Sequence, residues 1–334
     1  MRTVYLGTSE FAATVLAHLA EGPHRPALVI TRPDRPSGRG RKLAAPPVAE
    51  AAQRLGLALA QPERVNEPDA LATIEQVAQP AAATTAAATT TTAASATTTG
   101  LILIVCAFGA LIKEPLLSAY SPLNVHPSLL PRWRGAAPIE RAIMAGDERT
   151  GVSIMRLTAG LDSGPVCLAA AEAIDPQDTY GTLAARLARL GGELLVRVLD
   201  EWEGGQPPPF VEQEEAHASY AEKLGPADRL LDPQRSAAQL ERVVRALQPH
   251  IGARLALADG TALGVHRARA LAQAQEQEQE QEQELPPPGV IAEAGGRLLY
   301  GTRAGALELL EVQPPGGRPM DATAYLRGHK LSST

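Results

Sequence analysis

The N-terminal part of the chain alternates short apolar runs with helix-like segments, and this alternation restricts the possible folds most. The run Thr3–Leu6 predicts a buried strand. After a turn at Gly7 a helix is predicted, capped by Thr8 or Ser9 and with Glu10 in its first turn. "ALVITRPD" predicts a second strand that ends in a proline-marked loop. Strand, helix and strand in this order are typical of a parallel α/β sheet, which binds ligands beyond the carboxyl ends of its strands.

The same alternation continues along the chain. A helix is predicted from about Val48 to Leu55 and a short strand near Leu57 to Ala60. The segment "LILIVCAFGALI" contains the strongest buried strand, which opens into a loop at Phe108 and Gly109. The glycines after the first strand do not form the GxGxxG pattern, so a dinucleotide cofactor is not predicted. We therefore expect an N-terminal Rossmann-like parallel sheet.

A change in composition separates this region from the C-terminal part. Residues 204–217 include "GGQPPPF" and have the glycine and proline content of a linker. Beyond them, "SAAQLERVVRALQP" predicts an amphipathic helix, and short strand-like runs separated by Asp-Gly and Gly-Gly turns follow it. This pattern is typical of a small β-barrel, so the 334 residues are expected to form two domains, at 1–203 and 218–334.

Two low-complexity segments interrupt these domains. Residues 80–100 are almost entirely Ala and Thr, and residues 273–284 alternate Gln with Glu. Neither has an apolar period that could contribute to a packed core, so both are predicted to be surface insertions.

Charge and cysteine content exclude several classes of protein. The net charge of −6 argues against a chain coated in basic residues, although a local basic patch can still bind nucleic acid. Cys106 and Cys167 have no CxxC partner, which favours neither a disulfide framework nor a metal site and points to a reducing cytoplasm. The first apolar run is too short for a signal peptide and no later run could span a bilayer, so no membrane association is expected.

The segment "NVHPSLLPRWRG" carries the clearest chemistry. In an extended segment Asn124 and His126 point the same way, which brings an amide donor and an imidazole together. Such a pair suits acyl transfer, because the amide and the imidazole can stabilise the negative charge that develops on a carbonyl oxygen. The alternative is that Asn124 caps a turn and His126 is a structural histidine.

A carboxylate follows in "LTAGLDSGPV". Glycines on both sides let the backbone expose Asp162, which could orient and polarise His126 or take up a proton through water. An ordinary Asx turn is the alternative for this position.

A third feature is the basic loop "TRPDRPSGRGRKL". Its prolines stiffen it, its glycines permit close approach, and its arginines can contact phosphates through two hydrogen bonds at once. A solvated charged loop would have the same composition. The basic residues, set against the single acidic Asp34, are Arg32, Arg35, Arg39, Arg41 and Lys42.

Several of these motifs, taken in order, resemble a known family. The stretch from Asn124 to Pro165 is similar to the core of the formyltransferases that use 10-formyltetrahydrofolate, with Asn-x-His, Ser-Leu-Leu-Pro and Leu-Asp-x-Gly. "LGTSEFA", the basic loop, "YAEKL" and "SAAQLERVVRA" extend the resemblance to the methionyl-tRNA formyltransferases. It covers both ends of the chain and most of what lies between, apart from the two low-complexity segments.

The resemblance implies roles for individual residues. The implied catalytic residues are Asn124, His126 and Asp162. In the implied reaction, the α-amine of methionine on initiator methionyl-tRNA attacks the formyl carbon directly. Asn124 and His126 then stabilise the oxyanion of the tetrahedral intermediate, and Asp162 assists proton transfer. Neither a metal nor a covalent nucleophile is implied. The implied folate site lies in Ser128, Leu129, Leu130 and Pro131 and in the loop Cys106–Ile112 with Phe108 and Gly109.

The resemblance also implies the nucleic-acid contacts. Arg35, Arg39, Arg41 and Lys42 are the implied tRNA contacts, with Arg39 the critical residue near the end of the acceptor stem. The C-terminal domain is implied to be OB-fold-like and to bind tRNA, and its candidate phosphate contacts are Arg242, Arg245, Arg254, Arg267 and Arg269. Arg132 and Arg134 stay unassigned, because partners for carbonyls or carboxylates are an equally good interpretation.

Two other functions remain open from the sequence. One is a formyltransferase acting on a small amine, such as glycinamide ribonucleotide or a nucleotide sugar. The other is a non-catalytic RNA-binding protein on the same scaffold. The basic loop and the barrel domain disfavour the first, and the intact Asn124, His126 and Asp162 disfavour the second. We expect a cytoplasmic monomer.

Overall fold

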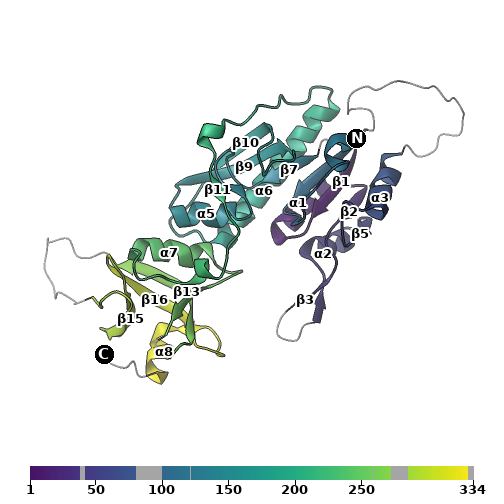
Figure 1. The fold of residues 1–334 in the computed structure, drawn as a ribbon. Helices are drawn as coiled ribbons and strands as arrows, with labels where there is room; N and C mark the ends of the chain where they lie inside the picture. Colours follow the sequence, from purple (N-terminus) through teal and green to yellow (C-terminus); the bar gives the residue numbers. More distant parts are fainter. Residues whose placement is uncertain (38–41, 80–99, 121, 258, 272–284, 330–334) are drawn as a thin grey trace, which may run out of the picture. The chain divides into compact units, whose positions relative to one another are not determined.

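A computed structural model describes residues 1–37, 42–79, 100–120, 122–257, 259–271 and 285–329 (Figure 1). The predicted insertions, apart from Gly100, therefore lie outside the described residues. The chain divides into two compact units. The first comprises Met1–Gly135, Thr150–Glu172 and Ala184–Tyr220, and the second Ala136–Arg149, Ala173–Leu183 and Ala221–Thr334. The chain thus passes between the units several times, a feature that composition does not reveal.

A seven-stranded sheet forms the centre of the first unit, in the order β10-β9-β7-β6-β1-β2-β5. The strands from β5 to β7 pair in parallel, whereas β9 runs antiparallel to β7. The predicted Rossmann-like sheet is confirmed, with antiparallel pairing toward one edge. Its strands are β1 (Arg2–Gly7), β2 (Leu28–Ile30), β5 (Leu59–Ala60), β6 (Leu101–Cys106), β7 (Leu123–His126), β9 (Arg149–Arg156) and β10 (Val166–Ala173).

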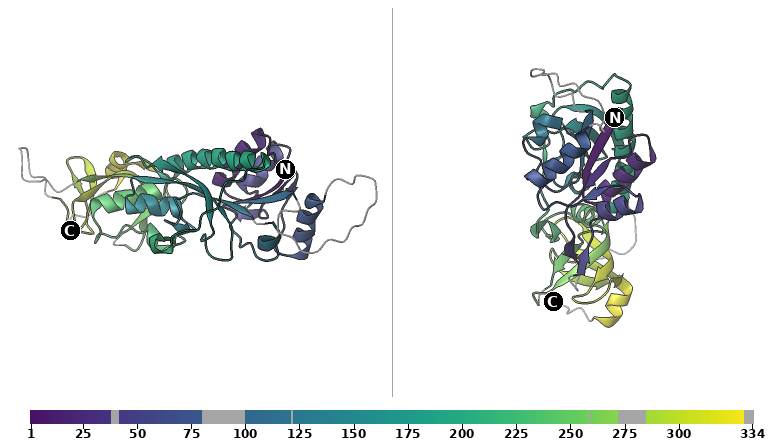
Figure 2. Two further views of the ribbon diagram at one scale, coloured as in Figure 1. Left: turned by 90° about the horizontal axis from the view of Figure 1, so that it is seen from above. Right: turned by 90° about the vertical axis from the view of Figure 1, so that its right-hand side faces the viewer.

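Helices cover both faces of this sheet, as both views in Figure 2 show. Ser9 caps the first helix as predicted, because its side chain accepts a hydrogen bond from the Ala12 N–H at 3.3 Å. Gly191 lets helix α6 (Tyr180–Glu203) approach strand β7 (Leu123–His126) closely, since a Cβ at this position would lie 2.9 Å from Val125 Cγ1. The helices are α1 (Glu10–Glu21), α2 (Pro47–Arg54), α3 (Pro68–Ala78), α4 (Leu116–Tyr120) and α6 (Tyr180–Glu203), whose first turn belongs to the second unit.

The order of the strands determines where a ligand can bind. From β1 the chain builds β2 and β5 on one side and then β6 and β7 on the other, so the sheet has a topological switch point between β1 and β6. Ligands of such sheets bind beyond the carboxyl ends of the strands at that point. Gly7 closes β1 there, and a Cβ on it would lie 2.9 Å from the Ala12 Cβ and 3.1 Å from the Cys106 carbonyl oxygen.

The second unit contains an antiparallel sheet in the order β12-β13-β16-β15-β14, with β17 paired to β16. Its core includes Leu240, Val244, Leu255 and Leu307. The predicted separate C-terminal β domain is confirmed. Its elements are α5 (Pro138–Ala145), α7 (Ala237–Ala246), β12 (Ala253–Ala256), β13 (Ala262–Leu271), β14 (Ile291–Ala294), β15 (Arg297–Gly301), β16 (Ala306–Gln313), β17 (Met320–Asp321) and α8 (Ala322–Gly328).

Short elements complete the fold. β3 (Arg35–Ser37) and β4 (Lys42–Ala44) form an antiparallel ribbon, and β8 (Arg134–Gly135) pairs with β11 (Tyr220–Ala221). Two 3₁₀ turns lie at Glu215–His217 and Ala227–Arg229. Among the helices of the described residues, none has the length and apolarity needed to span a membrane.

Candidate active site

Strand β7 carries two of the predicted catalytic residues. Asn124 and His126 are 7% and 4% exposed, and alternation along the strand puts both side chains on the same face of the sheet. Asn124 lies opposite Val105 of β6 and Met155 of β9, so the sheet holds its backbone from both sides. The side-chain amide of Asn124 makes no hydrogen bond to any other residue that the structure describes.

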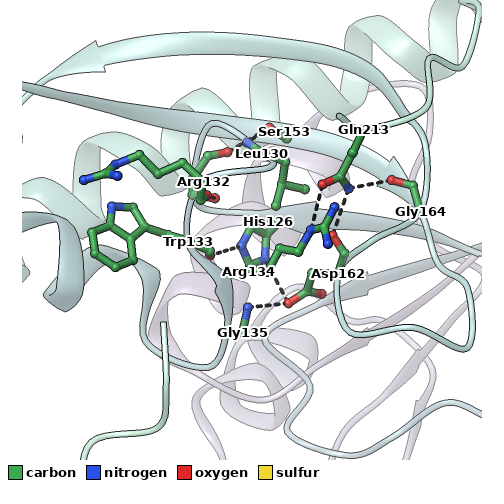
Figure 3. Close-up of polar contacts among 11 residues, drawn as sticks. His126, Leu130, Arg132, Trp133, Arg134, Gly135, Ser153, Asp162, Gly164 and Gln213 are labelled. Carbon is green, nitrogen blue, oxygen red and sulfur yellow. Dashed lines mark hydrogen bonds and ion pairs between the residues drawn. The ribbon is translucent and has the colours of Figure 1, made fainter. Parts of the chain in front are cut away.

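The orientation of the His126 ring follows from a main-chain contact. Its Nε2 lies 2.9 Å from the carbonyl oxygen of Trp133 (Figure 3). A carbonyl oxygen can only accept a hydrogen bond, so Nε2 carries the hydrogen and donates it. The other ring nitrogen, Nδ1, lies 3.7 Å from Asp162 Oδ2, which is within ion-pair distance but longer than a hydrogen bond. Nδ1 is therefore the nitrogen through which His126 can exchange a proton.

Asp162 meets His126 from a loop with an unusual backbone. Its φ of 45° lies in the left-handed region, which is uncommon for residues other than glycine, although Asp adopts it more readily than most. Its Oδ2 accepts the Gly135 N–H at 2.8 Å. The structure thus brings His126 and Asp162 together as the motifs predicted, although the Trp133 carbonyl, and not Asp162, makes the hydrogen bond that orients the ring.

The turn after β7 is held by buried hydroxyl groups. Ser128 is fully buried and its Oγ donates to the Arg132 carbonyl at 2.6 Å. Ser153 of β9 donates to the Ser128 carbonyl at 2.8 Å and accepts the Leu130 N–H at 3.2 Å. The Ser128 hydroxyl therefore maintains the turn, while Leu129, Leu130 and Pro131 are half-buried and offer apolar surface.

The loop after β6 is anchored from outside. The Phe108 carbonyl accepts a hydrogen bond from Thr8 Oγ1 at 2.8 Å, and the Gly109 carbonyl accepts one from Arg32 Nη1 at 2.6 Å. Gly109 has a φ of 72°, which favours glycine.

Burial raises the pKa of the Cys106 thiol to about 12, against a smaller opposing effect of its hydrogen bond with Tyr5. This thiol is protonated at neutral pH and cannot act as a nucleophile.

The sequence did not reveal the polar network around the buried Arg134, whose partner Glu215 is exposed. Arg134 is 2% exposed; its Nε donates to Gln213 Oε1 at 3.0 Å and its Nη1 donates to the Glu215 carboxylate at 2.8 and 3.0 Å. Burial acts to lower the pKa of Arg134, but hydrogen bonds and charge from Glu215 and Tyr220 outweigh it and raise that pKa. No pattern marks Gln213, which lies in the stretch whose composition predicts a linker.

Of the four predicted tRNA-contacting residues, Arg35 and Lys42 lie on the β3–β4 ribbon. Ser37 pairs with Lys42, so the two strands bracket residues 38–41, and Arg39 and Arg41 lie outside the described residues. Lys42 is exposed, and Arg35 forms an exposed ion pair with Glu63 at 3.4 Å. Exposed pairs of this kind contribute little, so Arg35 can exchange Glu63 for another anion.

The candidate arginines of the second unit are largely engaged within it. Arg269 pairs with the Glu308 carboxylate at 2.6 Å, and Arg267 lies 3.9 Å from the Asp321 carboxylate. Arg245 Nη1 donates to the Asp178 carbonyl at 2.6 Å, and the Arg242 guanidinium lies 3.0 Å from where a Cβ of Gly146 would stand. For Arg254, on the exposed side of β12, the part of the chain described contains no ion pair.

No metal cluster accompanies these residues: the parts of the chain that the structure describes contain no group of three or more His, Cys, Asp or Glu side chains placed to hold a metal ion.

Known proteins resemble the whole chain. The family "Formyl transferase" matches residues 1–199, and "Formyl transferase, C-terminal domain" matches residues 223–330. Methionyl-tRNA formyltransferase of Halorhodospira halophila is 40% identical, over 99% of this chain and 97% of that protein. Methionyl-tRNA formyltransferase of Methylococcus capsulatus is 37% identical, over 99% and 98%.

Among solved structures, HypX from Aquifex aeolicus in complex with tetrahydrofolic acid has the same fold, with a TM-score of 0.59 and 16% identity. The match covers 98% of this chain and 47% of that one, so the chain spans about half the length of HypX. The two family matches follow each other along the chain, and the two relatives match it over nearly its full length at 37% and 40% identity. The chain therefore belongs to the formyl transferase family, among the methionyl-tRNA formyltransferases.

Proposed function

We propose that this protein transfers the formyl group of 10-formyltetrahydrofolate to the α-amine of methionine carried on initiator tRNA. The observation that carries the proposal is the pairing of His126 Nδ1 with Asp162 Oδ2 at 3.7 Å, beside Asn124, in a member of this family. These groups lie at the carboxyl end of β7, near the switch point of the sheet, where α/β proteins bind their ligands.

The residues around this cluster fit a folate donor. A folate has a flat ring system and an apolar linker, which require apolar walls and a loop of fixed shape. Leu129, Leu130 and Pro131 offer half-buried apolar surface, and the loop at Phe108 and Gly109 is anchored by Thr8 and Arg32. We propose that these two segments hold the donor, with Ser128 acting through the shape of its turn.

The proposed reaction is a direct transfer. The lone pair of the amine forms a bond to the formyl carbon, the formyl oxygen takes negative charge, and the bond from the formyl carbon to the folate nitrogen then breaks. Asn124 donates its amide N–H to the developing oxyanion, and such a donor accounts for about 10²- to 10³-fold in rate. His126, when protonated, adds a second donor through Nδ1, because its Nε2 is already donating to Trp133.

Proton movement is assigned to Asp162. Its carboxylate accepts the proton that the amine loses, and protonated His126 gives its Nδ1 proton to the leaving folate nitrogen. The proton on Asp162 then moves to His126 Nδ1, 3.7 Å away, which restores both groups for the next turnover. A covalent enzyme intermediate is not part of the proposal, since the Cys106 thiol has a pKa of about 12 and the Ser128 hydroxyl is engaged with the Arg132 carbonyl.

The tRNA is assigned to two parts of the chain. Arg35, Arg39, Arg41 and Lys42 on or between β3 and β4 contact phosphates of the acceptor stem, for which a two-stranded ribbon provides a narrow, stiff support. An OB-fold-like domain at 218–334 binds the body of the tRNA, and residues 1–203 form the catalytic domain. Residues 204–217 lead from one to the other but belong to the first unit, where Gln213 contacts the Asp162 loop. The protein acts as a monomer in the cytoplasm, where initiator tRNA is charged.

The test is formyl transfer by the purified protein from 10-formyltetrahydrofolate, with three acceptors in parallel: methionyl-tRNA, glycinamide ribonucleotide and an amino-sugar nucleotide. Rapid transfer to methionyl-tRNA alone is expected. Preference for either small amine would replace the proposed acceptor, and transfer to none of the three would reject the proposed reaction.

A further inference from the structure

The His126 imidazole lies between two residues with strained backbones. Trp133, which supplies the carbonyl to Nε2, has a φ of 63°, and Asp162, which faces Nδ1, has a φ of 45°. Such a backbone conformation costs about 1 to 3 kcal/mol and persists only where surrounding contacts hold it in place. Something must therefore hold both residues, because their positions determine what each ring nitrogen meets.

Both residues are held by one segment, Gln213–Ser219. Gln213 Nε2 donates to the carbonyl oxygens of Asp162 and Gly164, at 2.8 and 2.7 Å (Figure 3). At the other end, Ser219 Oγ accepts the Trp133 N–H at 3.0 Å. We propose that Gln213 and Ser219 are positioning residues for formyl transfer: they hold Asp162 and Trp133 against the two nitrogens of His126.

The orientation of the Gln213 amide supports this role. Two of its partners are carbonyl oxygens, which require the NH₂ group, and the third is the Arg134 Nε–H, which requires the oxygen. All three contacts are satisfied in one orientation only. The Glu215 carboxylate, from the same segment, binds Arg134 and fixes its position. Arg134 in turn binds the Gln213 amide oxygen, so the NH₂ group of Gln213 points at the Asp162 loop.

The consequence for catalysis is geometric. Gln213 touches none of the groups assigned to chemistry, but it holds the main chain of Asp162 while the Gly135 N–H holds the Asp162 carboxylate at 2.8 Å. Losing the first contact lets the loop relax toward an ordinary backbone conformation and moves the carboxylate. A displacement of about 1 Å at a reacting group can lower a rate about 10²-fold.

A double-mutant cycle tests the role of Gln213. The variants are Gln213→Met, which keeps the side-chain length without the amide, Asp162→Asn, and the two combined, with single-turnover formyl transfer as the readout. We expect Gln213→Met to lower the rate about 10- to 10²-fold with unchanged affinity for a folate analogue, and to have no further effect when Asp162→Asn is present. Losses that multiply in the double variant, or a single-variant rate within about twofold of wild type, would overturn the proposal.

Controls separate positioning from loss of stability. Gln313→Met removes a similar half-buried amide, which donates to the Gly317 carbonyl at 2.9 Å in the second unit, and should leave the rate unchanged. If Gln213→Met does not fold, Gln213→Glu replaces it: the carboxylate can still accept from Arg134 but cannot donate to the carbonyls, and the same loss is expected. Ser219→Ala should reproduce the loss in part; a wild-type rate in that variant would remove Ser219 from the proposal.

The inference rests on the proposed function for its kinetic readout, so a second measurement does not depend on activity. Hydrogen exchange at the Gly135 amide reports its bond to Asp162. In Gln213→Met this exchange should accelerate, while peptides of the second unit stay unchanged. Protection at Gly135 equal to wild type would reject the positioning role even if the protein formylates no tRNA, whereas faster exchange in a protein without this activity would refute only the proposed function.

Discussion

Replacing Ser153 by Ala should weaken both the fold and folate binding, because its hydroxyl makes two of the hydrogen bonds that hold the turn after β7. Ser153 is completely buried, donates to the Ser128 carbonyl at 2.8 Å and accepts the Leu130 N–H at 3.2 Å. Each lost bond lowers stability by about 1 kcal/mol, and a buried group left without a partner adds to that, so about 2 to 3 kcal/mol is expected in total. For a unit of this size that lowers Tm by about 4 to 12 °C.

The measurement is urea and thermal unfolding followed by circular dichroism, together with the Kd of a folate analogue. Ser118→Ala is the matched control: its hydroxyl also makes a short hydrogen bond, to Glu114 at 2.6 Å, but on an exposed helix, and its loss should change stability by less than about 0.5 kcal/mol. Folate should bind Ser153→Ala more weakly, since Leu129 and Leu130 move with the turn. Equal stability of the Ser153 and Ser118 variants would refute the argument.

Further predictions concern the catalytic residues, the ribbon and the buried thiol. Asn124→Ala or His126→Ala should lower turnover about 10²- to 10³-fold in a protein with a native circular dichroism spectrum; near-normal turnover would remove that residue from the mechanism. Arg39→Leu should reduce use of methionyl-tRNA and flatten its dependence on salt while folate affinity stays the same, and equal losses in both would mean that the ribbon supports the fold. Cys106, fully buried and with a pKa of about 12, should resist iodoacetamide at pH 8 until the protein is unfolded; rapid labelling of the native protein would contradict this burial.

Local sequence determined the elements and their order. The apolar runs of β1 and β6 are buried along their lengths, Ser9 caps α1, and Ser236 with Gln239 forms the capping box of α7. These features depend on residues a few positions apart, so their spacing can be recognised without any tertiary information. The same holds for Asn124 and His126, because alternation along one strand is enough to place them on the same face.

Tertiary structure alone decided what these side chains meet. Asp162 and Gln213 are 51 positions apart in the sequence, and Arg134 and Glu215 are 81 positions apart. Each pair meets only when separate segments of the first unit fold together. The composition of 204–217 predicts a linker, yet two of its side chains hold the Asp162 loop and Arg134. In the second unit, Arg269 is paired with Glu308 of a neighbouring strand, which the sequence does not indicate. Hydrogen bonds between distant residues depend on angles and distances that no local pattern encodes, so the sequence can name the reacting groups but not what positions them.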